Sequence, residues 1–123
     1  MWYDGIGPQH ILNYLDHKNW GSGMIKHIVM WRLDREPGDI YPEKQAHEMQ
    51  TRLTALQGKI PEIQNFEVGL DINRSDRAFD VVLVSSFASR DDLATYSRHP
   101  LHQELVEFFR GITSEVRVVD DEV

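Results

Sequence analysis

The 123-residue sequence contains no cysteine, so disulfides, thiolate metal sites and a cysteine nucleophile are all excluded. No apolar run approaches the roughly 18 to 20 residues of a membrane-spanning helix, and the first residues lack the basic and then apolar order of a signal peptide. Acidic residues outnumber basic ones by 20 to 13, and the net charge is −7. The chain therefore has no general electrostatic attraction for nucleic acid or for an anionic membrane. These absences predict a cytoplasmic protein that binds neither.

The composition that remains is that of a soluble globular protein, with 41% hydrophobic and 27% charged residues. A chain of this length allows one ordinary domain. Residues 1–23 differ from the rest because they end in Gly21-Ser-Gly23, a flexible-linker composition, which a second methionine follows. We expect residues 1–23 to be an appended leader or a natural extension, and residues 24–123 to form the domain.

From Met24 onward, hydrophobic periodicity predicts strands interspersed with helices. The run that begins at Ile25 is apolar on both faces, whereas the run from Phe66 alternates between apolar and polar residues. A helix that begins at Pro42 carries its apolar residues at spacings of three and four. The expected strands are 25–33, 66–73, 78–87 and 113–121, and the expected helices are 42–57, 89–98 and 100–110. This order is the ferredoxin-like βαββαβ arrangement, an α+β fold with a four-stranded antiparallel sheet.

Both helical layers of such a fold cover one face of the sheet and leave the other face bare. The first and third strands nevertheless place Ile28, Met30, Val82 and Val84 on that bare face. A monomer would expose a larger apolar surface there than soluble proteins normally tolerate. We therefore predict a homodimer in which two helix-free sheet faces pack together, with the geometry of a dimeric α/β barrel.

The chemistry-bearing side chains gather in the stretch Tyr96-Ser-Arg-His99-Pro100-Leu-His102, where a phenol and two imidazoles fall within seven residues. Pro100 suits the first turn of a helix, because its missing N–H would have no partner there. His99 precedes the proline and is biased away from helical geometry, so we expect it on a bend between two short helices. Such a bend can direct several proton-carrying side chains at one pocket.

Residues 24–123 resemble the stress-responsive A/B barrel (Dabb) family. The resemblance rests on five motifs in family order, which are Met24-Ile-Lys-His-Ile-Val-Met-Trp, Gly58-Lys-Ile-Pro-Glu-Ile, Phe66-Glu-Val-Gly69, Ser75-Asp-Arg-Ala-Phe-Asp80 and Tyr96-Ser-Arg-His-Pro-Leu-His102. It implies a dimeric ferredoxin-like barrel. Most members of the family have no established reaction, so the resemblance implies a fold and a pocket more directly than an activity.

A plant member of this family, a polyketide cyclase, closes its product by an aldol-type condensation. Its acid–base residues fall in the first strand, the third strand and the Tyr-to-His segment. By motif, the resemblance implies that His27, Tyr96, His99 and His102 take these positions here. On the third strand this chain has Asp80 where the cyclase has a histidine, which departs from the cyclase pattern.

Aldol-type chemistry needs a base beside a carbonyl and a donor that stabilises the enolate. On this hypothesis His102 is the base, Tyr96 is the donor and His27 is a polar catalytic group in the pocket. The remaining candidates for the pocket wall are His99, Asp80, Trp31 and Phe109. No metal-ligand spacing is present, and we expect no cofactor.

Three interpretations stay open at this point. The protein could be a Dabb protein without an established reaction that binds a small apolar or carbonyl-containing molecule. It could instead be a cofactor-independent enzyme of cyclase or lyase type that uses His102, Tyr96 and His27. Finally, it could be a purely structural dimer in which Phe108, Phe109 and Trp31 fill the space beside packed, hydrogen-bonded histidines.

Overall fold

The computed structural model describes residues 23–36 and 41–123. The expected leader therefore lies outside the described residues except for Gly23, and its division from the domain stays a prediction. Within the described residues the strands are β1 (Ile25–Leu33), β2 (Asn65–Leu70), β3 (Val81–Phe87) and β4 (Thr113–Glu122), and the helices are α2 (Glu43–Thr54), α3 (Arg90–Arg98) and α4 (Pro100–Arg110). None of these helices is long and apolar enough to cross a membrane.

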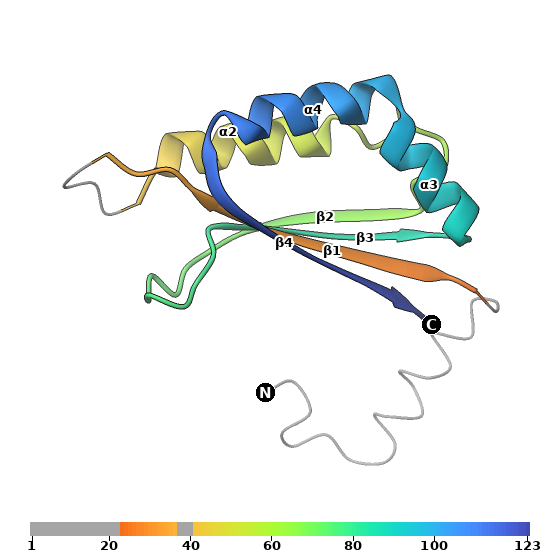
Figure 1. Cartoon of the computed structure of the whole chain (residues 1–123), viewed down its shortest axis with the longest axis horizontal. Helices are drawn as coiled ribbons and strands as arrows, with labels where there is room; N and C mark the ends of the chain where they lie inside the picture. Colours follow the sequence, from red (N-terminus) through yellow and green to blue (C-terminus); the bar gives the residue numbers. More distant parts are fainter. Residues whose placement is uncertain (1–22, 37–40) are drawn as a thin grey trace, which may run out of the picture.

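The four strands form one antiparallel sheet in the order β2-β3-β1-β4. All three helices lie on one face of this sheet, with α2 and α4 beside each other above it and α3 at one end (Figure 1). The predicted α+β fold with a four-stranded antiparallel sheet is confirmed. Because β2 and β4 are the edge strands, β1 and β3 carry the centre of the core.

The core lies between the sheet and the two long helices. On α2 the residues Ala46, Met49 and Leu53 are all buried, as the helical spacing predicts. Trp31 of β1 and Phe109 of α4 meet edge to face, with ring centroids 5.6 Å apart. These contacts hold α4 over β1, and a cavity lies between this helix and the sheet.

The junction between α3 and α4 is set by two side-chain caps. Ser89 accepts a hydrogen bond from the backbone N–H of Asp92 at 3.1 Å and begins α3. His99 has extended backbone geometry, and its Nδ1 accepts a hydrogen bond from the N–H of Leu101 at 3.1 Å. Pro100 then occupies the first turn of α4. The predicted bend at His99 is confirmed, and it orients α3 and α4 differently over the sheet.

The helix-free face of the sheet carries apolar side chains that are only partly covered. Met30 is 37% exposed and Val119 is 59% exposed, and Ile28, Val82 and Val84 beside them are partly buried. The predicted apolar character of this face is present in the folded chain.

Two predicted strand boundaries differ from the structure by three residues each. The second strand ends at Leu70, and Ile72, expected on its buried face, is 94% exposed. The carboxylate of Asp71 accepts a hydrogen bond from the N–H of Asn73 at 2.9 Å, which turns the chain away from the sheet. The third strand begins at Val81 rather than at residue 78.

Candidate functional site

A cavity of about 420 Å³ lies between α4 and the helix-covered face of β1, β3 and β4. Its wall is mainly apolar and includes Trp31, Leu83, Leu105 and Phe109. Val118 of the edge strand β4 also lines the cavity and is 54% exposed, so the cavity opens to solvent along this strand. A largely apolar cavity of this size with a few polar groups is typical of small-molecule sites.

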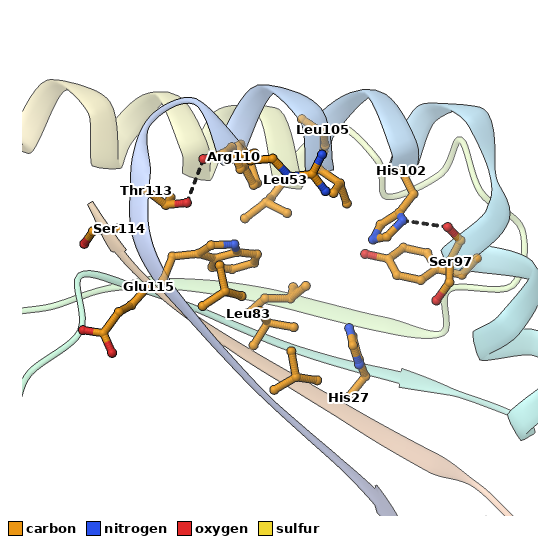
Figure 2. Close-up of a pocket in the computed structure, with 17 residues that line it drawn as sticks. His27, Leu53, Leu83, Ser97, His102, Leu105, Arg110, Thr113, Ser114 and Glu115 are labelled. Carbon is orange, nitrogen blue, oxygen red and sulfur yellow. Dashed lines mark hydrogen bonds between the residues drawn. The ribbon is translucent and has the colours of Figure 1, made fainter. Parts of the chain in front are cut away.

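Three of the predicted site residues meet at one end of this cavity. His27 comes from β1, Tyr96 from α3 and His102 from α4, and all three line the cavity. The ring centroids of Tyr96 and His102 are 4.5 Å apart, and those of His27 and Tyr96 are 6.1 Å apart. Figure 2 shows His102 descending from α4 and His27 rising from the sheet toward the same part of the cavity. The fold thus brings together three of the four residues that the resemblance marked as acid–base groups.

The tautomer of His102 follows from one hydrogen bond. Its Nδ1 lies 2.9 Å from the backbone carbonyl oxygen of Ser97, and a carbonyl oxygen only accepts, so Nδ1–H donates. The other ring nitrogen, Nε2, then carries the lone pair of the neutral imidazole. Burial lowers the pKa of His102, although the hydrogen bond to Ser97 partly opposes this effect. His102 is therefore a neutral acceptor near pH 7.

Tyr96 supplies the complementary donor. Its side chain is among the most deeply buried in the described part of the chain, with 1% of the residue exposed. Burial raises the pKa of the Tyr96 phenol, because the charged phenolate is poorly solvated in this environment. The phenol therefore keeps its proton under physiological conditions.

His27 is oriented by Asp120, a residue that the sequence interpretation did not identify. The two residues stand opposite each other in the β1–β4 pairing, and the Nδ1–H of His27 donates to Oδ1 of Asp120. When the imidazole is neutral, this pair leaves Nε2 of His27 as the acceptor nitrogen. Ninety-three positions separate the two residues. Only the alternation of Val116, Val118 and Asp120 along the last strand hinted that Asp120 shares the pocket face.

Two residues predicted to line the pocket lie elsewhere. Asp80 is buried and accepts hydrogen bonds from the N–H of Leu33 at 2.7 Å and from the guanidinium of Arg35 at 2.7 and 3.0 Å. It belongs to a separate polar cavity that Arg32 and Arg74 also line. This corrects its placement, because its carboxylate holds the end of β1 rather than a pocket imidazole.

His99 is the second such correction. Its ring nitrogen is occupied by the cap of α4, and the residue is not part of the cavity wall. Trp31 and Phe109 do line the cavity, as expected. Their edge-to-face contact forms part of the apolar wall without filling the space.

Over residues 23–36 and 41–123, no three or more His, Asp or Glu side chains come together in a group that could hold a metal ion. The imidazoles and the phenol that line the cavity can form hydrogen bonds and transfer protons.

The lowered pKa of His102 makes folding stability depend on pH. In the unfolded chain the imidazole of His102 takes up a proton at about pH 6.5, whereas in the folded chain it does so only at lower pH. Between those two values the unfolded state holds more protons, so the free energy of unfolding should fall as the pH drops below about 6.5. We expect His102→Gln to remove this contribution. Urea unfolding of both proteins across this range measures it, and an identical pH slope in the variant would contradict the assignment.

Comparison with known proteins places this geometry in a family. The model of the Stress Responsive A/B Barrel Domain matches residues 25–123. No curated protein matches the sequence. Among solved structures, a dimeric ferredoxin-like protein of unknown function from Bacteroides fragilis is 29% identical, with a TM-score of 0.71 over 85% of this chain and 100% of that one.

Two further structures share the fold at lower identity. A hydroxynitrile lyase from Passiflora edulis is 22% identical, with a TM-score of 0.70 over 84% of this chain and 95% of that one. A Dabb family protein with a ferredoxin-like fold from Mesorhizobium loti is 20% identical, with a TM-score of 0.62 over 82% of this chain and 97% of that one.

Proposed function

Because the chain belongs to the stress responsive A/B barrel domain family, we propose that it is a homodimer whose subunits each bind a small, mainly apolar molecule that carries a carbonyl group. The ligand lies in the cavity between α4 and the sheet. The observation that carries this proposal is the convergence of His27, Tyr96 and His102, from three separate elements, at one end of an apolar cavity.

The polar end of the cavity complements a carbonyl group. The phenol of Tyr96 is a hydrogen-bond donor for a carbonyl oxygen, and its own surroundings keep it protonated. The two imidazoles offer acceptor nitrogens for an adjacent hydroxyl or acidic C–H. The apolar wall favours a ligand whose remaining atoms are hydrocarbon or aromatic.

Ligand binding can be followed through the fluorescence of Trp31, which lines the cavity. Trp2 and Trp20 are first replaced by phenylalanine so that Trp31 is the remaining indole. Titration with octan-2-one and acetophenone should then change the emission saturably. We expect Val118→Phe to weaken binding by about tenfold or more, because the larger side chain enters the cavity from its open side. The matched control is Ile72→Phe, which adds a phenyl ring at an exposed site outside the cavity wall.

The control variant should bind both ketones as the parent protein does. If the parent protein binds a ketone saturably and Val118→Phe does not change the affinity, the ligand lies outside this cavity. No binding of any carbonyl compound would contradict the proposal and favour the structural dimer.

A second candidate function is that of a cofactor-independent lyase or cyclase. The observation that favours it is the pairing of a neutral base with a protonated donor, since His102 presents Nε2 at the same cavity end as the Tyr96 phenol. The carboxylate of Asp120 can also stabilise a proton taken up by His27. The hydroxynitrile lyase of Passiflora edulis has this fold, which makes lyase chemistry a reasonable class to test.

The proposed dimer uses the helix-free face of the sheet. The B. fragilis relative is a dimeric protein, and here Met30 and Val119 leave apolar surface exposed on that face. We expect Met30→Asp to weaken dimerisation about a hundredfold or more, because association would take a carboxylate, instead of an apolar side chain, out of water. Sedimentation equilibrium measures the effect.

The control for the dimer is Ile72→Asp, which places the same charge at an exposed apolar position away from the central strands. It should sediment as the wild type does. A dimer that survives Met30→Asp with unchanged affinity would show that another surface forms the interface.

A further inference from the structure

The cavity has a second polar end, opposite the His27, Tyr96 and His102 cluster. It is lined by Arg110, Thr113, Ser114 and Glu115, where α4 ends and β4 begins. Figure 2 shows these four residues on one side of the apolar wall and His102 with His27 on the other. The cavity is therefore polar at both ends and apolar between them, and this feature says more about the ligand than a carbonyl group alone.

The polar side chains at this end differ in how firmly contacts within the protein hold them. Glu115 accepts hydrogen bonds from Arg32 at 3.0 Å and from Arg117 at 2.8 Å, so two cations offset its charge, and its carboxylate points away from the cavity (Figure 2). Thr113 donates its hydroxyl hydrogen to the carbonyl of Phe109 at 2.8 Å. Both groups are thus committed to contacts within the protein.

Arg110 is held more weakly. Its guanidinium contacts Glu107 at 2.8 Å on the same helix, but the two side chains are 70% and 74% exposed. Exposed pairs of this kind contribute little free energy, so Glu107 can be exchanged for another carboxylate at low cost. A guanidinium also binds carboxylates in a planar, two-point geometry. Arg110 is the group at this end that is best suited to take a ligand anion.

The geometry points to a two-headed ligand that carries a carbonyl group at the His102 end and a carboxylate at the Arg110 end, joined by an apolar chain or ring. This inference rests on the proposed function and specifies its ligand class. Arg110 lies eight positions after His102 on α4, a rise of about 12 Å along the helix axis. Figure 2 shows the guanidinium of Arg110 extending back toward His102, so the two ligand groups lie about 12 Å apart or less.

The test compares octan-2-one with 7-oxooctanoate, the keto acid in which a carboxylate replaces the terminal methyl group. Calorimetry gives the ratio of their affinities for the full-length protein. We expect the wild type to favour the keto acid about fivefold, and Arg110→Gln to remove this preference. Glu107→Gln should raise the preference further, about twofold to threefold, because the competing carboxylate is gone.

Arg98→Gln is the charge-matched control. It removes one cation from an exposed position at the end of α3, outside the cavity wall. The affinity ratio should stay at its wild-type value in this variant. A similar loss in both arginine variants would assign the preference to net charge and overturn the inference.

The two proposals fail in different ways. If neither compound binds the wild type, the proposed function itself falls. Octan-2-one could bind and be blocked by Val118→Phe, while the wild type does not prefer the keto acid or Arg110→Gln keeps that preference. This result would contradict the two-headed ligand and leave the proposed function in place. Opposite shifts of the affinity ratio in Arg110→Gln and Glu107→Gln would support the assignment of Arg110.

Discussion

Replacing His102 with glutamine is expected to slow the exchange of ketone α-hydrogens with solvent deuterium about a hundredfold or more. On the acid–base interpretation, Nε2 of His102 removes the α-proton while the phenol of Tyr96 stabilises the enolate oxygen. Glutamine can keep a hydrogen bond to Ser97 but cannot act as a base. The measurement is the rate at which the α-proton signals of octan-2-one disappear in deuterated buffer with wild-type or variant protein. This assay needs no knowledge of the natural substrate.

The matched control is His47→Gln, which makes the same chemical change on the exposed face of α2. His47 lies 3.9 Å from Glu43, and both side chains are more than half exposed. Its exchange rate should equal that of the wild type. Wild-type exchange that His102→Gln leaves unchanged would contradict the assignment of His102 as the base. A wild type that binds ketone without accelerating exchange would contradict the enzyme interpretation and leave the binding function in place.

Replacing Asp80 with asparagine is expected to lower the free energy of unfolding by about 2 to 3 kcal/mol. The Asp80 side chain is 2% exposed and faces a guanidinium that is 30% exposed. Asparagine keeps the shape of the side chain but removes its negative charge. This charge pairs with the guanidinium of Arg35 and accepts a hydrogen bond from the N–H of Leu33. The variant therefore loses charge-assisted hydrogen bonds that the buried carboxylate makes in the wild type. Urea unfolding measures this effect: the shift in the midpoint, multiplied by the m-value that both proteins share, gives the difference in the free energy of unfolding.

The surface pair of Arg52 and Glu48 provides the control for Asp80. These side chains lie 3.5 Å apart on α2 and are 45% and 48% exposed. Glu48→Gln should change the unfolding free energy by less than about 0.5 kcal/mol. If Asp80→Asn costs no more than Glu48→Gln, the buried carboxylate does not hold the end of β1 as its contacts indicate.

The fold was predictable because its signals are local. Spacings of three and four marked the buried stripe of α2, and Ser89 and Pro100 marked where two helices begin. Ile72 was misplaced because its alternation with polar neighbours continued past Leu70, the last residue of the strand. Periodicity reports which residues alternate, but the turn at Asp71 depends on a side chain that bonds to its own backbone.

The site was only partly predictable because its geometry depends on contacts between distant segments. The Tyr96 to His102 stretch lies within one bend, and the resemblance added His27 from the first strand. Asp120 contacts His27 only through the register of β1 and β4, which a sequence pattern does not specify. Asp80 was assigned to the pocket by its motif, whereas pairing with Arg35 holds it in the other polar cavity. Cytoplasmic location and independence from cofactors stay predictions.

The most direct measurement is of nuclear Overhauser effects between bound octan-2-one and the ring protons of His27 and His102. We expect contacts from the hydrogens beside the carbonyl to both imidazoles and from the distal chain to the apolar wall at Leu83 or Phe109, because all four side chains line one cavity. The contacts should disappear when Val118→Phe fills the opening. Ligand contacts confined to the helix-free face of the sheet, or none at saturating ketone, would contradict a carbonyl-binding site at these histidines.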